Sequence, residues 1–141
     1  MTHKILIATG IFYPEIGGSA SYARLLCQKL SQNHSIVLLT YSPVFRDRQD
    51  KLLPYKVIRV WKAAPKFLRH SIYFLRVLFL TKRSDTVFAL NAISAGLPAL
   101  MAARILKKKF LVRIAGDYAW ETAANKSKTF FLIDDFQKSK K

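Results

Sequence analysis

The feature that most constrains the fold of this chain is its first segment, residues 4–30, which reads KILIATGIFYPEIGGSASYARLLCQKL. An unbroken apolar run over residues 5–8 is typical of a strand buried on both faces of a parallel sheet. Later apolar residues recur at helical spacing and can pack one helix face on that sheet: Ala23, Leu26, Cys27 and Leu30. The segment therefore predicts a strand, a loop and an amphipathic helix.

The loop ends in two adjacent glycines before the expected helix, with Ser19 as the expected N-cap. Gly17 and Gly18 leave the backbone bare where unpaired amides and the positive end of the helix dipole emerge, so a diphosphate can approach. A glycine pair at this position can also serve only for close packing of helix on strand. Neither G-x-G-x-x-G nor G-x-x-x-x-G-K-[ST] fits, because Gly10 is too far from the pair and no lysine follows it.

Further apolar runs predict an α/β fold, a Rossmann-like, doubly wound, mostly parallel sheet with helices on both faces. The expected strands cover residues 35–40, 55–60, 86–90 and 110–114, the second of them near an edge. A helix is expected over residues 65–83, and another should end near Lys109. The buried face expected for the latter consists of Leu97, Leu100, Met101 and Ile105. Ligands should gather beyond the carboxyl ends of the strands.

Basic residues are concentrated in one region of the chain. Lys and Arg number 24 against eight Asp and Glu, a net charge of +16, and residues 41–84 hold eleven basic and two acidic residues. Such an excess indicates an anionic partner. Nucleic acid is not expected, because no recognised nucleic-acid motif or stacking platform accompanies the charge.

The segment PKFLRHSIYFLRVLFLTKR, residues 65–83, combines apolar residues with a basic stripe. Arg69, Arg76 and Arg83 are seven apart, which places them on one side of a helix. These charges interrupt the apolar residues too often for a membrane span. Two interpretations stay open: docking on an anionic membrane surface, or packing of the helix on the sheet.

Cys27 is the single cysteine, which excludes a disulfide within the chain and fits a reducing compartment. Its place on the apolar helix face indicates a packing residue.

The first residues read as a strand, not a signal peptide. We expect a cytoplasmic protein, either free or peripheral at the inner face of the cell membrane. No cluster of metal-ligating residues at ligand spacing is seen, so neither metal nor cofactor is expected.

Two stretches resemble motifs of one enzyme family. Residues 9–30, TGIFYPEIGGSASYARLLCQKL, resemble the first glycine loop and helix of retaining glycosyltransferases of the GT-B type, family 4. Residues 113–121, RIAGDYAWE, are similar to a second signature of a bacterial branch of that family. The motifs stand in the expected order and at the expected distance, and the resemblance covers nearly the whole chain.

The resemblance implies an activity and roles for individual residues. The expected reaction transfers a hexose, with retention, from a nucleotide-diphosphate sugar to a glycan or a membrane-associated, lipid-linked acceptor. Gly17 and Gly18 would contact the donor phosphates, and Asp117 stands near the position of a catalytic-site His or Asp in many members. Contacts with the acceptor or support of the loop are expected from Asn91, Tyr118 and Glu121.

A chain of 141 residues has room for one domain, whereas a GT-B enzyme has two Rossmann-like lobes with the reaction between them. We expect residues 1–121 to form the N-terminal, acceptor-side domain and residues 122–141 to begin a poorly ordered, cleft-facing segment. The C-terminal, donor-binding domain is expected to be absent, as in a fragment, a truncated frame or a split enzyme. Such a chain alone should have little or no activity. The alternative function is a non-catalytic, basic module that binds membrane surfaces.

Overall fold

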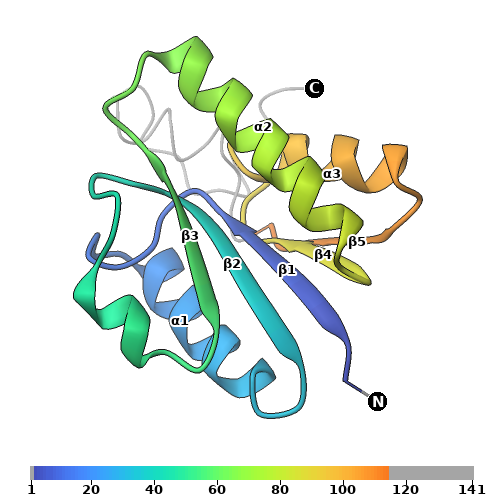
Figure 1. Ribbon diagram of the computed structural model, residues 1–141, viewed down its shortest axis with the longest axis horizontal. Helices are drawn as coiled ribbons and strands as arrows, with labels where there is room; N and C mark the ends of the chain where they lie inside the picture. Colours follow the sequence, from blue (N-terminus) through green and yellow to red (C-terminus); the bar gives the residue numbers. More distant parts are fainter. Residues whose placement is uncertain (1, 115–141) are drawn as a thin grey trace, which may run out of the picture.

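A parallel sheet of five strands forms the centre of the structure, a computed structural model that describes residues 2–114 (Figure 1). The strands lie in the order β3-β2-β1-β4-β5, and all neighbours are parallel. Their bounds are β1 Lys4–Thr9, β2 Ser35–Ser42, β3 Lys56–Trp61, β4 Thr86–Ala89 and β5 Lys109–Val112. The predicted Rossmann-like α/β fold is confirmed, with β3 at an edge as expected.

Helices cover both faces of this sheet (Figure 1). On one face lie α1, Gly18–Leu30, and a short 3-10 helix, η1, Arg48–Leu52. On the other face, α2, Lys66–Lys82, packs against α3, Gly96–Ile105. The chain changes faces between β3 and β4, so the strand order reverses beside β1. Open parallel sheets bind their ligands at such a reversal.

Burial on both faces explains the unbroken apolar run of β1. Leu6 and Ala8 belong to the apolar cluster under α2 and α3, whereas Ile7 belongs to the cluster under α1. All three side chains are fully buried. Burying a Leu or Ile side chain contributes about 2 kcal/mol. A strand with alternating polar residues would lose this contribution on one face and would be less stable in this position.

The inner face of α1 packs on the sheet through small side chains. Ala20, Ala23 and Cys27 are buried there, as the helical spacing predicts for the last two. Burial raises the pKa of the Cys27 thiol to about 12. Cys27 is therefore uncharged at neutral pH and serves as a packing residue.

The buried face of α3 differs from the prediction. The large residues expected to be buried point outward, since Leu97, Met101 and Ile105 are exposed. The sheet side of the helix consists instead of small residues, Gly96, Ala99, Ala102 and Ala103. α3 shares one face of the sheet with α2, and small side chains allow it to lie close to both. The expected burial of Leu97, Met101 and Ile105 is therefore wrong, whereas Leu100 is partly buried.

The end of α3 also differs from the prediction, because the helix stops at Ile105 and Lys109 already belongs to β5. Lys107 has a φ of 53°, the left-handed conformation that ends many helices. The amide of Lys108 donates to the Ala103 carbonyl at 2.8 Å, and that of Lys107 donates to the Arg104 carbonyl at 3.2 Å. This pair of bonds is a Schellman motif, which satisfies carbonyls that the helix leaves free.

Candidate functional site

The crevice where the strand order reverses is built around a close backbone approach. Gly10 follows β1, and a Cβ at this position would lie 2.6 Å from Ser94 Oγ and 2.7 Å from Asn91 Nδ2. Only glycine fits here without movement of both side chains. Gly10 thus brings the end of β1 against the loop that follows β4.

Asn91 organises the loop after β4. Its Oδ1 accepts hydrogen bonds from the Ala95 amide at 2.9 Å and from the Ser94 hydroxyl at 3.2 Å. Gly96 begins α3 directly beside it, and a Cβ there would lie 2.3 Å from the Asn91 carbonyl oxygen. Asn91 therefore contributes to the structure of this loop, while a contact with an acceptor stays a prediction.

The start of α1 presents free backbone amides. The N-cap is Gly17, and the prediction of Ser19 as N-cap is wrong because the chain is already helical at Gly18. No side chain caps this end, and the first turn holds no acidic residue. The amide of Ser21 is bonded to the Gly17 carbonyl at 3.0 Å, so the three amides before it have no partner within the helix. Such amides, at the positive end of the helix dipole, favour an anionic ligand.

The two glycines at this helix start have room for side chains. A Cβ on Gly17 would meet only the Ile11 Cδ1 atom, at an ordinary 3.6 Å, and one on Gly18 would meet nothing within 4 Å. Close packing of helix on strand therefore does not require glycine at either position. The loop therefore leaves open space beside both glycines, while the approach of an anion stays a prediction.

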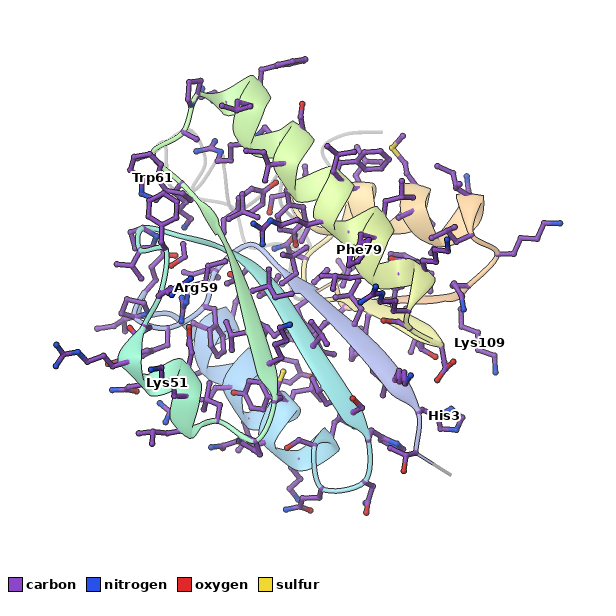
Figure 2. The ribbon with its side chains drawn as sticks, viewed as in Figure 1. His3, Lys51, Arg59, Trp61, Phe79 and Lys109 are labelled. Atoms are coloured by element: carbon purple, nitrogen blue, oxygen red, sulfur yellow. The ribbon has the colours of Figure 1, made fainter. Side chains whose placement is uncertain are left out.

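Arg59 holds the glycine loop from the edge strand β3 (Figure 2). Its buried guanidinium donates to the Asp50 carboxylate from Nε at 2.8 Å and from Nη2 at 2.7 Å. Its Nη1 donates to the Tyr13 carbonyl at 2.7 Å and to the Ser42 hydroxyl at 3.0 Å. One side chain thus joins η1, the end of β2 and the loop that precedes α1. Such a bidentate, charge-assisted arrangement holds its partners in a defined geometry.

A second contact to the loop comes from Lys62, whose ammonium pairs with the Glu15 carboxylate. The Lys62 carbonyl in turn accepts a hydrogen bond from Arg69 Nη1 at 2.8 Å. Arg69 is therefore engaged near the loop. Arg76 and Arg83, which the sequence places on the same stripe, line a separate groove on α2.

The structure brings together parts of the two motifs. Arg113, the first residue of the second motif, lies over the ring of Tyr22 in α1, with 4.1 Å between the guanidinium carbon and the ring centroid. The Arg113 amide donates to the Ala89 carbonyl at 2.8 Å, which fixes the chain beside the end of β4. A cation thus lies against the helix that follows the glycine loop. The remaining predicted site residues, Asp117, Tyr118 and Glu121, lie outside the described residues.

An apolar pocket of about 370 Å³ lies between α2 and α3 at the carboxyl edge of the sheet. We call it the α2–α3 pocket; it is lined mainly by Tyr41, His70, Phe74, Ile93, Leu97 and Met101. The Tyr41 hydroxyl and His70 Nδ1 are 2.9 Å apart. A mostly apolar hollow with one imidazole and the hydroxyls of Tyr41 and Ser94 suits an amphiphilic ligand.

Two buried tyrosines support this pocket. The Tyr41 ring stacks on that of Tyr73 with 4.2 Å between centroids, and the Tyr73 hydroxyl donates to the Thr9 carbonyl at 3.3 Å. Burial raises the pKa of Tyr41 to about 12, although Arg69 opposes the shift. Tyr41 is therefore a neutral hydroxyl at physiological pH.

Sequence reasoning did not single out Arg59 or His70 as site residues. The residues that contact Arg59 and His70 lie far from them in the chain, so local sequence patterns do not reveal these contacts. The one signal for this part of the site was the position of Tyr41 at the end of a predicted strand. In the described part of the chain, no helix is long and apolar enough to cross a membrane. Among residues 2–114, no three His, Cys, Asp or Glu side chains are grouped closely enough to hold a metal ion.

Comparison with known proteins identifies the fold. No protein-family model matches the chain, and no curated protein sequence matches it. The structure is similar to the lipopolysaccharide outer core galactosyltransferase WaaB in its apo form, with a TM-score of 0.53 and 18% identity. That match covers 77% of this chain and 32% of WaaB, so the chain spans about a third of that enzyme.

A second similar structure is the C-terminal domain of a hydrogenase from Pyrococcus furiosus, with a TM-score of 0.55 and 14% identity. This match covers 79% of the chain and 91% of that domain. The same fold is thus found in a glycosyltransferase and in a hydrogenase domain. The comparisons show a Rossmann-like, glycosyltransferase-like α/β fold, and function has to be argued from the site.

Proposed function

We propose that this chain supplies the N-terminal, acceptor-side lobe of a retaining glycosyltransferase of the GT-B type, family 4. One observation carries the proposal: Gly17 and Gly18 are glycines where the fold has room for larger residues. A diphosphate that closely approaches the backbone amides explains why side chains are excluded there. The similarity to WaaB supports this assignment through the fold alone.

In the proposed reaction, a hexose leaves a nucleotide diphosphate and the leaving group gains negative charge. The free amides at the start of α1 stabilise part of this charge, because fixed dipoles need no reorganisation during the reaction. Arg113 adds a positive charge against α1. The larger share would come from basic residues of a second lobe. Asp117 is proposed as the catalytic-site residue beside the sugar.

The acceptor is proposed to be a glycan or a lipid-linked sugar held at the same edge of the sheet. The α2–α3 pocket supports an amphiphilic acceptor, since its apolar lining suits a hydrocarbon and His70 offers a hydrogen bond to a hydroxyl. Further contacts with the acceptor, or support of the loop, are proposed for Asn91, Tyr118 and Glu121. The proposed location is the cytoplasm, at the inner face of the cell membrane.

Binding of a donor tests this proposal. Titration of the nitrogen-15-labelled chain with UDP-glucose and with GDP-mannose should shift the amide resonances of Gly17 and Gly18 at millimolar ligand with at least one of these probes. Gly18→Glu should abolish the shifts, because it places a negative charge beside the diphosphate. Gln28→Glu adds the same charge at an exposed position near the other end of α1 and should leave them unchanged. No shift at the loop of the folded chain with either nucleotide sugar would contradict the proposal.

Activity of the chain alone tests the assignment to one lobe. Incubation of residues 1–141 with a nucleotide sugar and a lipid-linked acceptor should give little or no transfer, because these residues are proposed to supply only one of the two lobes that hold the donor. Robust turnover would overturn this part of the proposal.

The second candidate function, a non-catalytic membrane-surface module, is favoured by the basic residues of α2. Such a module would bind vesicles and show no shift at Gly17 or Gly18.

A further inference from the structure

A continuous groove runs along the outer face of α2 to the amino-terminal edge of the sheet. Its first part, about 360 Å³, lies between α2 and β3 and includes Ile58, Leu75, Arg76 and Phe79. Its second part, about 200 Å³, includes Lys4, Ser35 and Ser84. Both parts share Lys56, Leu80 and Arg83, so we treat them as one feature, the basic groove. It lies at the opposite edge of the sheet from the crevice and the glycine loop.

The basic groove combines an exposed apolar wall with positive charge. Leu75 and Phe79 are 63% and 55% exposed. They lie one turn apart on α2, where Figure 2 labels Phe79. The guanidinium of Arg83 lies over the Phe79 ring, with 4.3 Å between its carbon and the centroid. Apolar surface and a cation therefore occupy the same place.

Four cations line this groove, namely Lys4, Lys56, Arg76 and Arg83. Within residues 2–114, both ion pairs involve other residues, so these four have no carboxylate within 4.0 Å. Asp85 also lies at this edge, where its carboxylate accepts a hydrogen bond from the Lys4 amide at 2.8 Å. One negative charge does not balance four positive ones, and the groove remains basic.

We propose that the basic groove binds an anionic phospholipid at a membrane surface. The phosphate of the head group pairs with Lys56 and Arg83, where the two parts of the groove meet, and the adjoining hydrocarbon packs on Leu75 and Phe79. Charge complementarity selects an anionic lipid, and the exposed apolar wall of Leu75 and Phe79 selects a lipid over a free anion. This inference does not depend on the proposed sugar transfer.

The two sides of α2 reconcile the interpretations left open by the sequence. Tyr73, Val77 and Thr81 are buried on the inner side, where the helix packs on the sheet. The outer side carries the groove, and its apolar residues have no such cover in the described structure. One helix therefore serves both the core and an outside surface.

Co-sedimentation of the full chain with vesicles tests the proposal. The chain should bind vesicles of equimolar phosphatidylcholine and phosphatidylglycerol, and not vesicles of phosphatidylcholine alone. The double variant Arg76→Gln with Arg83→Gln should lower the partition coefficient about 30-fold, because each cation near an anionic surface contributes about fivefold. Equal binding to neutral and anionic vesicles would overturn the proposal.

A matched pair of charge changes separates the groove from the overall charge. Lys29→Gln with Lys51→Gln removes the same charge from α1 and η1, on the opposite face (Figure 2). This pair should lower binding by less than about threefold, since screening limits the effect of distant charges. A loss equal to that of the groove pair would mean that no particular surface is used, contrary to the proposal.

A third variant tests the apolar part of the groove. Phe79→Ser removes an exposed ring, so the circular dichroism spectrum and the melting temperature should stay close to those of the parent chain. Binding to anionic vesicles should fall about tenfold, because part of the transfer free energy of the ring is lost. The salt dependence of the residual binding should be unchanged. Full binding by Phe79→Ser would show purely electrostatic attachment and would refute the proposed lipid contact.

Discussion

Two pairs of glycines at the same edge of the sheet differ in what surrounds them. Gly10 and Gly96 lie in the crevice between β1 and β4, where a Cβ would overlap atoms of Asn91. Gly17 and Gly18 lie at the start of α1, where a Cβ would be accommodated. The first pair is required by the fold of the chain itself. The second has no such requirement in the described structure, and the proposed donor diphosphate would supply one from outside the chain.

This difference teaches that a glycine in a loop is informative only once its neighbours are known. From the sequence, all four positions look alike, because each follows a strand or precedes a helix. The structure shows which glycines are required for close packing, Gly10 and Gly96, and which leave the backbone accessible, Gly17 and Gly18. Variants at these glycines, and at Arg59, which holds the glycine loop, test whether the two pairs differ in this way.

The largest effect on stability is expected at Arg59 in β3, which supports the loop that carries Gly17 and Gly18. Arg59→Ala should lower the free energy of unfolding by about 4 kcal/mol, because it leaves the Asp50 carboxylate without its buried partner. Urea denaturation followed by circular dichroism measures this loss. Lys51→Ala removes an exposed cation of η1 and should change stability by less than about 0.5 kcal/mol. Similar stabilities for both variants would mean that the loop is not held by Arg59.

Gly96→Ala should give the second largest effect, about 3 kcal/mol of destabilisation. The added Cβ would lie 2.3 Å from a backbone oxygen, so the start of α3 has to move. The midpoint of thermal unfolding should fall accordingly. Ala95→Gly, one position earlier, provides a control in which a buried methyl group is removed instead of added. It should cost about 1 kcal/mol. If the Gly96→Ala variant were as stable as the parent chain, close packing would not require glycine at this position.

Gly10→Ala should destabilise the chain by about 1 to 2 kcal/mol, less than the change at Gly96. The atoms that the new Cβ would meet belong to the side chains of Ser94 and Asn91, and these can move. The double variant Gly10→Ala with Ser94→Ala should recover part of the loss, since it removes one of the two close contacts. Equal stabilities of the single and double variants in urea would contradict this explanation.

Gly18→Ala should have the smallest effect on the free energy of unfolding. Unlike the other variants it should stabilise the chain, by about 0.5 kcal/mol. Nothing lies within 4 Å of the added Cβ, and alanine restricts the unfolded chain. The same variant should weaken binding of a nucleotide sugar severalfold, because the methyl group keeps the phosphates from the backbone. A loss of stability would mean that Gly18, like Gly10 and Gly96, is required for packing. Unchanged binding would remove the argument for a ligand at this loop.

The central strands β1 and β2 were predictable from the sequence because a strand buried on both faces carries a continuous apolar run. The buried face of α3 was not predictable in the same way. Its large residues share one side of the helix, but periodicity does not say which side faces the sheet when a second helix lies alongside. Only the position of α2 makes Ala99 and Ala102 the inner residues, with Leu97 and Met101 outside.

The candidate site was predictable only where its residues are neighbours in the chain. The open turn at Gly17 and Gly18 follows from local spacing and is present in the structure. His70 meets Tyr41 across 29 positions, and Arg59 meets the Tyr13 carbonyl across 46. Such pairs depend on how α2 and β3 are placed against the sheet, and no local pattern encodes this placement. Asp117 lies outside the described residues, and its role stays a prediction.

The buried thiol of Cys27 gives the chain a reporter of its own opening. It is the single cysteine of the sequence, it has no exposed surface, and it lies between α1 and the sheet. A thiol reagent can therefore modify the chain only when this helix leaves its place. The labelling rate at low denaturant would measure how often α1, which begins at the glycine loop, detaches from the sheet, without any engineered label.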